Sequence, residues 1–133
     1  MEDRVTLDNI TKLNNNEIFV FGSNLSGIHG KGAAKKALTW GAKWGQAVGL
    51  QGRTYGIPTK DSSIRRTLSL NEIKPFVDDF IEFAKNNQKL VFLVTEIGCG
   101  LAGLKPKDVA PLFNECVNIE NIHLPERFWK KIL

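Results

Sequence analysis

The sequence predicts an α/β domain with a mostly parallel central sheet and helices on both sides of it. Short β-rich runs alternate with helical segments along the chain, as they do in folds built from parallel strands and crossover helices. The run Leu90–Thr95 (LVFLVT) is apolar almost without alternation, which is typical of a central strand covered on both faces. No internal repeat, low-complexity tract or linker divides the 133 residues, so we expect a single domain over residues 1–133.

The other elements are expected from local composition. Short apolar runs predict further strands, at Glu17–Phe21, at Thr54–Ile57 (ended by Pro58) and at Asn121–Leu124. Helix-favouring composition or helical spacing predicts helices, at Gly32–Trp40, at Pro106–Val117 and, as a terminal turn, at Arg127–Leu133.

A further helix is expected where apolar residues recur at helical spacing, from Ile73 to Ala84. Ser69 and Glu72 have the spacing of a capping box, which predicts that the helix starts after Ser69. Pro75 argues against a helix interior that close to the start, so Asn71 is the alternative cap.

Composition limits the classes of protein. No apolar run approaches the roughly 20 residues of a membrane span, and the first residues lack a signal-peptide pattern, so we expect no membrane association. Cys99 and Cys116 are the only cysteines, which favours a reducing compartment and a cytoplasmic protein. The net charge of +4 suits an anionic ligand, but a solvated basic surface is the favoured explanation of it.

Glycine-rich loops follow two predicted strands, at the points where parallel α/β sheets bind ligands. The first loop runs from Gly22 to Gly32, and the second is Gly98-Cys99-Gly100-Leu101-Ala102-Gly103. The second formally matches G-x-G-x-x-G but lies too late in the chain for a dinucleotide-binding βαβ unit. Backbone N–H groups in such loops bind phosphates, so the sequence predicts a pocket for a phosphate-bearing, nucleotide-like molecule. A flexible surface loop is the alternative interpretation of the first.

Two side chains beside these loops are candidates for the site. Asn24 follows the first strand and could hydrogen-bond a sugar hydroxyl or cap a turn. Lys60 comes shortly after the Thr54–Ile57 strand. It could bind an anion or act as a nucleophilic amine, and the alternative is an exposed lysine beside Asp61.

Other reactive side chains give weaker signals. Cys99 has no evident histidine partner, so a small residue filling a tight turn is favoured over a nucleophile. His29 and His123 lack metal-ligand spacing, so we expect no metal site.

Together these loops resemble the macro domain family of ADP-ribose-binding modules, and most closely the branch that contains the terminal ADP-ribose protein glycohydrolase. Ile97–Leu101 (IGCGL) is similar to the diphosphate-binding segment of that branch, and Gly30–Ala34 to its glycine-rich loop and helix start. Pro58-Thr59-Lys60 falls where the branch has its catalytic lysine. Val5–Asp8 is similar to the opening strand and the aspartate that reads the adenine amine, with a helix cap as the alternative for Asp8.

The resemblance implies a three-layer α/β/α macro-like domain and assigns the site residues. Lys60 would be catalytic. The implied ligand-binding residues are Asp8, Asn24, Gly30, Lys31, Gly32, Ala33, Gly98, Cys99, Gly100, Leu101, Ala102 and Gly103. No cofactor is implied.

One position departs from the branch. In the glycohydrolase branch, the residue after IGCGL is an aspartate that completes the catalytic pair with the lysine. In this chain the same position is Ala102. Alanine cannot move protons, so the lysine–aspartate mechanism requires a substitute such as Asp61, Glu96 or a bound water. We therefore expect a domain that binds ADP-ribose, a close relative or an ADP-ribosylated macromolecule, with hydrolysis of ADP-ribosyl adducts left open. The alternatives are a non-catalytic module that sequesters a nucleotide signal and, less favoured because no binding motif is present, a nucleic-acid-binding domain.

Overall fold

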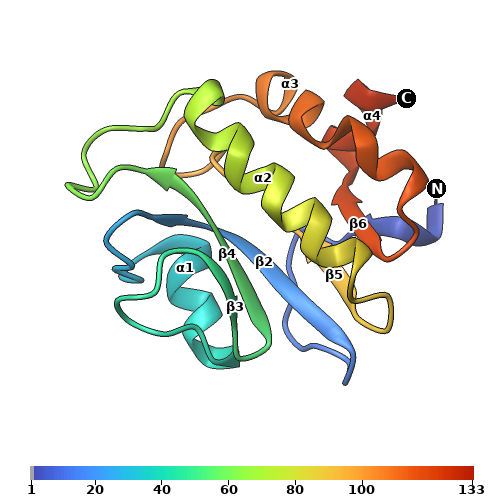
Figure 1. Ribbon diagram of the computed structural model, residues 1–133, viewed down its shortest axis with the longest axis horizontal. Helices are drawn as coiled ribbons and strands as arrows, with labels where there is room; N and C mark the ends of the chain where they lie inside the picture. Colours follow the sequence, from blue (N-terminus) through green and yellow to red (C-terminus); the bar gives the residue numbers. More distant parts are fainter. Residues whose placement is uncertain (1) are drawn as a thin grey trace.

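The computed structural model describes residues 2–133. Six strands form one sheet in the order β1-β6-β5-β2-β4-β3 (Figure 1). The strands are β1 (Val5–Thr6), β2 (Glu17–Asn24), β3 (Gly49–Gln51), β4 (Thr54–Lys60), β5 (Val91–Val94) and β6 (Ile122–Pro125). All neighbouring pairs are parallel except β3 and β4, which are antiparallel. The predicted α/β domain with a mostly parallel sheet is therefore confirmed.

Helices connect the strands. The α-helices are α1 (Gly32–Ala37), α2 (Leu70–Lys85), α3 (Pro106–Val109) and α4 (Glu126–Ile132). Short 3₁₀ helices occupy Glu2–Arg4, Leu38–Trp40 and Ala110–Asn118. The helix expected over Pro106–Val117 is thus α-helical only in its first part. None of the helices that the structure describes is both long and apolar enough to cross a membrane.

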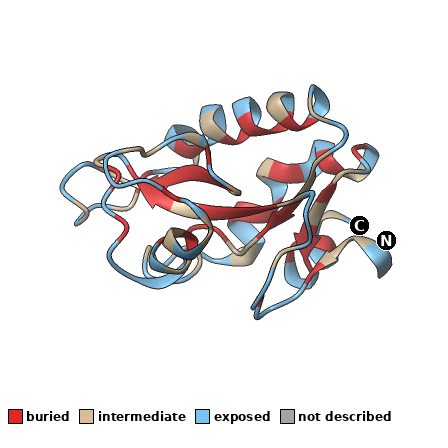
Figure 2. Ribbon diagram, turned by 90° about the horizontal axis from the view of Figure 1, so that it is seen from below, coloured by how far each residue is buried: buried red, intermediate tan, exposed pale blue. Residues whose placement is uncertain are grey.

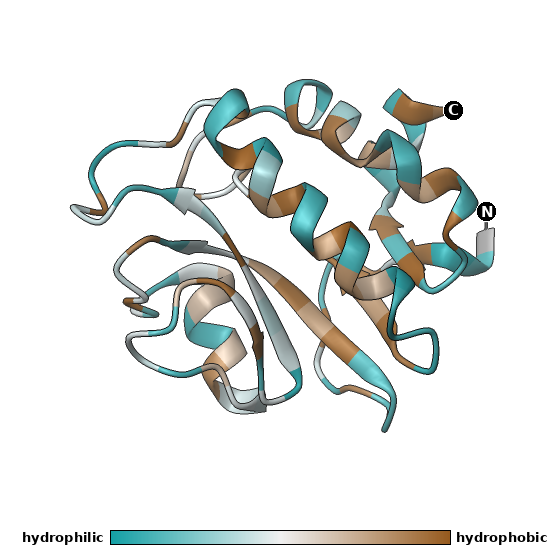
Figure 3. Cartoon of the chain, viewed as in Figure 1, coloured by the Kyte–Doolittle hydropathy of each residue, from teal (hydrophilic) through white to brown (hydrophobic). Residues whose placement is uncertain are grey.

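The sheet has an apolar core on each face. Alternate residues of a strand point to opposite faces, so Ile18 and Val20 of β2 join the core beneath α2. Phe19 and Phe21 of β2 join the second core, beneath α1. Figure 2 shows helices on both sides of the sheet with the buried residues between them, and Figure 3 shows the apolar residues of α2 along one side of the helix. Coverage on both faces explains why the β5 sequence does not alternate.

Helix α2 starts where the capping box predicts. The Ser69 hydroxyl accepts from the Glu72 N–H at 3.2 Å, and the Glu72 carboxylate accepts from the Ser69 N–H at 3.0 Å. The alternative cap at Asn71 is wrong, and Pro75 lies inside the helix. Proline removes one intrahelical hydrogen bond there, but the capping box and the buried apolar face of α2 outweigh that loss.

Two strands are longer than expected, and one was not expected. β2 continues to Asn24 and β4 to Lys60, because these two ends pair with each other. The predicted stop at Pro58 is therefore wrong. β3 pairs with β4 only as far as Gly56, so Pro58 lies where the outer side of β4 has no neighbour, and proline is tolerated at such an edge. β3 has only 3 residues, too few to show the alternation of apolar and polar residues that predicts a strand.

Candidate functional site

A cavity of about 760 Å³ lies at the carboxyl ends of β2, β4 and β5. This volume is within the range of small-molecule sites. Parallel strands end at the same edge of a sheet, so loops distant in the sequence meet there. The predicted site residues that line the cavity are Asn24, Gly30, Lys31, Gly32, Ala33, Lys60, Gly98, Cys99, Gly100, Leu101 and Ala102. Asp8 and Gly103 are not among the lining residues.

The floor of the cavity is formed where two strand ends approach closely. A Cβ atom on Gly22 would lie 3.3 Å from the Gly98 nitrogen and 3.3 Å from Thr59 Oγ1. Thr59 Oγ1 in turn donates to the Ser23 carbonyl at 3.2 Å. Glycine at position 22 therefore lets β2 and the IGCGL loop pack side by side, and the two glycine-rich loops face one cavity.

Asn24 shapes the first loop. Its Oδ1 accepts from the Ile28 N–H at 3.0 Å and from the Ser26 hydroxyl at 2.9 Å, and its Nδ2 donates to the Ile28 carbonyl at 2.7 Å. The sequence left two roles open for Asn24, capping a turn and hydrogen-bonding a sugar hydroxyl. The structure shows the contacts of the first role. One N–H of the Asn24 amide remains available to a ligand.

Both glycine-rich loops contain backbone N–H groups that have no acceptor among the described residues. Within residues 2–133, the N–H groups of Gly30 and Lys31 donate to no other residue, and neither do those of Gly100, Leu101 and Ala102. Successive free N–H groups around a concave surface are the arrangement that binds phosphate oxygens.

Two of the glycines are not required by the fold. A Cβ atom on Gly30 or Gly100 would meet no atom within 4 Å, and neither residue has a left-handed φ. Gly98 differs, because its φ is +74° and an added Cβ would lie 3.0 Å from Leu104 Cδ1. Gly30 and Gly100 thus line the cavity without being required by the turn geometry, and an added Cβ atom at either would meet open space, whereas Gly98 is needed for the turn.

Lys60 and Glu96 lie at opposite ends of the cavity. Lys60 ends β4, whereas Glu96 follows β5, and β2 lies between these strands. Two strand spacings separate the two residues by about 10 Å or more. Glu96 is the only carboxylate among the described lining residues, and it accepts from Arg127 Nε at 2.7 Å and Nη2 at 2.5 Å. The Glu96 carboxylate raises the pKa of Arg127. The negative charge of Asp8, which is exposed, raises this pKa further to a lesser extent.

Neither Asp61 nor Glu96, the two acidic candidates named from the sequence, lies in the cavity next to Lys60. Asp61 does not line the cavity, and its Oδ1 accepts from the Ser63 hydroxyl at 2.6 Å. That hydrogen bond, followed by bonds from backbone N–H groups and the charge of Arg66, lowers the pKa of Asp61. Glu96 lies at the far end from Lys60. Ala102 itself lines the cavity, and its carbonyl accepts from Thr67 Oγ1 at 2.6 Å.

Cys99 is protonated at neutral pH. Burial, and then the negative charge of Glu96, raises the pKa of its thiol to about 11. The thiol donates a weak hydrogen bond to the Ile97 carbonyl, with Sγ 3.4 Å from the oxygen. A thiolate nucleophile is therefore disfavoured here, in line with the interpretation of Cys99 as a small residue in a tight turn.

The histidines take no part in the cavity lining. His29 is fully buried, and its Nε2 lies 3.2 Å from Gln51 Oε1. Burial lowers the pKa of His123 on β6. Among residues 2–133, no three histidine, cysteine or acidic side chains are grouped as metal ligands would be.

Several lining residues were not predicted, namely Ile28, Ile64 and Thr95. Thr95 directly follows β5, at the carboxyl edge of the sheet, so its position in the sequence could have predicted that it lines the cavity. Ile64 lies in the loop between β4 and α2, and no local pattern placed that loop at the cavity.

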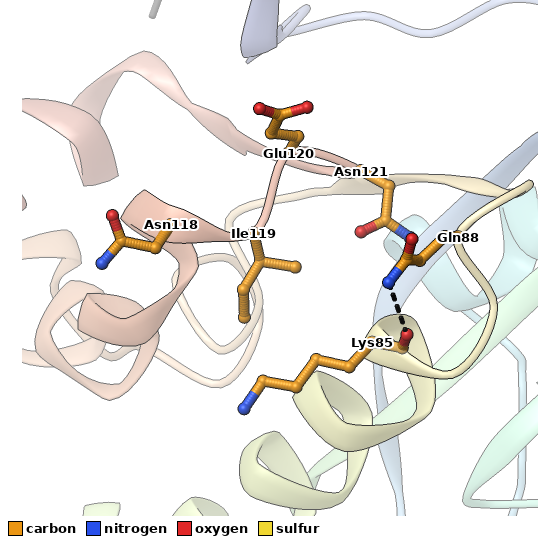
Figure 4. Close-up of a pocket in the computed structure, with 6 residues that line it drawn as sticks. All are labelled: Lys85, Gln88, Asn118, Ile119, Glu120 and Asn121. Carbon is orange, nitrogen blue, oxygen red and sulfur yellow. Dashed lines mark hydrogen bonds between the residues drawn. The ribbon is translucent and has the colours of Figure 1, made fainter.

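A second cavity of about 390 Å³ lies at the amino end of β6, between α2 and the segment before that strand. Figure 4 shows its residues, with Gln88 Nε2 donating to the Lys85 carbonyl at 3.3 Å. The Lys85 ammonium and the Glu120 carboxylate point away from each other in this view. The cavity therefore offers no convergent set of charged groups.

Comparisons of the chain with models of known protein families, with curated proteins and with solved structures found no match. The assignment of a ligand therefore depends on the geometry of the cavity and on the motif residues themselves.

Proposed function

We propose that this chain is a macro-like domain with a three-layer α/β/α fold that binds ADP-ribose or a closely related ADP-ribosyl compound. The observation that carries the proposal is the pair of glycines at Gly30 and Gly100. Both lie in loops with free backbone N–H groups, and neither is needed by the fold. A diphosphate held against the backbone of both loops accounts for the donors and for the absence of side chains.

The order of the strands supports a direction for the ligand. The two glycine-rich loops lie beside the central strand β2, so a diphosphate between them leaves one end of the cavity on each side. Lys60 and Asn24 are at the β4 end, where a second ribose would lie. Glu96 is at the β5 end, where the nucleoside would lie.

Calorimetry with ADP-ribose and AMP tests the proposal, because contacts to two phosphates should bind ADP-ribose more tightly than AMP. Gly30→Ala and Gly100→Ala should each weaken ADP-ribose binding by about tenfold or more, since an added methyl group occupies ligand space. Neither change should lower the melting temperature, because neither Cβ meets a protein atom.

Gly98→Ala is the matched control for these two variants. The left-handed φ of Gly98 makes alanine strained by about 1–2 kcal/mol, so this variant should lose stability as well. Equal affinity for AMP and ADP-ribose, or unchanged affinity in the folded Gly100→Ala variant, contradicts the diphosphate site.

A non-catalytic binding module is the second candidate, and the position of Asp61 favours it. A lysine that attacks the ribose carbon needs a partner to move protons, and Ala102 cannot supply one. Asp61 is held outside the cavity lining by Ser63 and Arg66, and Glu96 is paired with Arg127 at the other end. We therefore expect hydrolysis of ADP-ribosyl-glutamate to be slow, and any turnover to depend on Lys60.

A further inference from the structure

The loop between β4 and α2 contains a strained residue at the cavity. Ile64 has φ +67°, the only positive φ of a non-glycine residue within residues 2–133. A β-branched side chain is unfavourable in this left-handed conformation, so the rest of the loop must hold it there. Ile64 also lines the cavity together with Lys60.

Hydrogen bonds within the loop impose this conformation. The Ile64 N–H donates to the Asp61 carbonyl at 3.1 Å, and the Asp61 N–H donates to the Arg66 carbonyl at 2.9 Å. Asp61 Oδ1 accepts from the Ser63 N–H at 3.0 Å, and the Ser63 hydroxyl accepts from the Arg65 N–H at 3.2 Å. The tip of the loop is thus a closed turn with Ile64 at its centre.

The base of the loop is tied to the rest of the protein. Arg66 donates two hydrogen bonds to the Glu72 carboxylate, at 2.9 and 3.1 Å, which joins the loop to the start of α2. Thr67 bridges back to Lys60 and donates to the carbonyl of Ala102, so the loop closes beside the second glycine-rich loop. These anchors place Ile64 at the Lys60 end of the cavity.

We propose that Ile64 is a specificity-determining residue that packs against the second sugar of a dinucleotide-like ligand. The inference rests on the proposed ADP-ribose site. An apolar side chain that lines the cavity at the Lys60 end would exclude water from one face of a sugar ring placed there, without adding a contact to the diphosphate. Ile64 therefore selects ligands that carry a sugar beyond the second phosphate over ligands that end at that phosphate.

Calorimetry of wild-type protein and the Ile64→Gly variant with ADP-ribose and with ADP tests this role. Glycine removes the side chain and tolerates the left-handed conformation, so the melting temperature should stay the same or rise. Affinity for ADP-ribose should fall about tenfold, as expected for the loss of a largely buried apolar contact. Affinity for ADP should change less than twofold.

Two further variants complete the experiment. Ile64→Asn accepts the left-handed conformation with a polar side chain, and it should repeat the selective loss if the glycine variant folds poorly. Arg65→Ala changes an exposed residue of the same loop that does not line the cavity, and it should bind both ligands as the wild type does.

The outcomes separate the inference from the function on which it rests. Unchanged ADP-ribose affinity in both Ile64 variants, or an equal loss for ADP, overturns the role of Ile64 and leaves the ADP-ribose site standing. Wild-type protein that binds no ADP-ribose overturns the proposed function, and the role of Ile64 falls with it.

Discussion

The cavities at the two ends of the sheet differ in what their polar groups do. At the amino end, the Asn121 side-chain amide donates to the carbonyls of Ala84, Asn87 and Leu90 at 2.9, 3.2 and 3.1 Å. Lys85 is paired there with Glu115. Asn121 thus holds the start of β6 against the end of α2, and Lys85 joins α2 to the 3₁₀ helix Ala110–Asn118, so folding already uses these groups.

At the carboxyl end, five backbone N–H groups of the glycine-rich loops have no acceptor among the described residues, namely those of Gly30, Lys31, Gly100, Leu101 and Ala102. A cavity alone is therefore a weaker sign of a binding site than hydrogen-bond donors that the fold leaves unused. Substitutions at the amino end should therefore change stability alone, and substitutions at the carboxyl end should change binding first.

The largest effect is expected for Gly100→Glu. This side chain brings volume and a negative charge to the place proposed for the diphosphate, so ADP-ribose affinity should fall by at least about 100-fold. The melting temperature should change little, because a Cβ atom there meets no protein atom. Calorimetry and thermal melting measure the two quantities, and a folded variant that still binds ADP-ribose breaks the comparison.

The converse is expected for Asn121→Ala at the amino end. Removing the amide leaves three carbonyls without its N–H donors, which should lower the free energy of unfolding by about 1–3 kcal/mol. Urea denaturation measures this loss, and ADP-ribose affinity should stay unchanged.

Asn118→Ala is the matched control for Asn121→Ala. Asn118 lines the same cavity, but its exposed side chain makes no hydrogen bond to the described residues, so the free energy of unfolding should hardly change. A loss of affinity in Asn121→Ala would show that the two ends are coupled.

A smaller effect is expected for Ala102→Asp, which introduces the carboxylate found at this position in the glycohydrolase branch that the loops resemble. Release of ADP-ribose from ADP-ribosyl-glutamate should rise by about tenfold or more, since a positioned acid–base group contributes about 10²–10⁴-fold. The contact of Thr67 is to the backbone carbonyl of Ala102, so the substitution keeps it. Lys60→Ala in the same background should abolish the gain, and turnover that survives it would place the reaction elsewhere.

The smallest effect concerns acid stability at the start of α2. Hydrogen bonds from Arg66, and then from the Ser69 backbone, lower the pKa of Glu72 from 4.5 to about 2. A carboxyl group whose pKa is lowered in the folded state stabilises the protein above its unfolded pKa, and this contribution is lost as the pH falls toward the folded value. The melting temperature of Glu72→Gln should therefore be lower than that of the wild type at pH 7, and the difference should shrink between about pH 5 and pH 2.

Arg66→Gln is the partner variant, because it removes the main cause of the low Glu72 pKa. Its melting temperature should show the same pH dependence as that of Glu72→Gln. Since Arg66 also anchors the loop that carries Ile64, a matching decrease in ADP-ribose affinity would extend the binding region as far as the start of α2.

Features that depend on neighbouring residues could be predicted from the sequence. Ser69 and Glu72 lie three positions apart, so their reciprocal hydrogen bonds were predictable from spacing alone. The apolar run that contains β5 predicted a strand covered on both faces, and the two glycine-rich loops predicted backbone donors after strands. Because parallel strands share one carboxyl edge, the sequence also indicated that these loops would meet.

The tertiary structure decided the features that depend on residues far apart in the chain. β2 and β4 continue to Asn24 and Lys60 because the two ends pair with each other, and no local pattern encodes that pairing. Asp61 lies outside the cavity lining because the closed turn around Ile64 holds it there, and that same turn brings Ile64 to the site. Strand pairing and loop closure bring together residues that are distant in the sequence, so the three-dimensional arrangement, rather than residue spacing, determines which side chains reach the cavity.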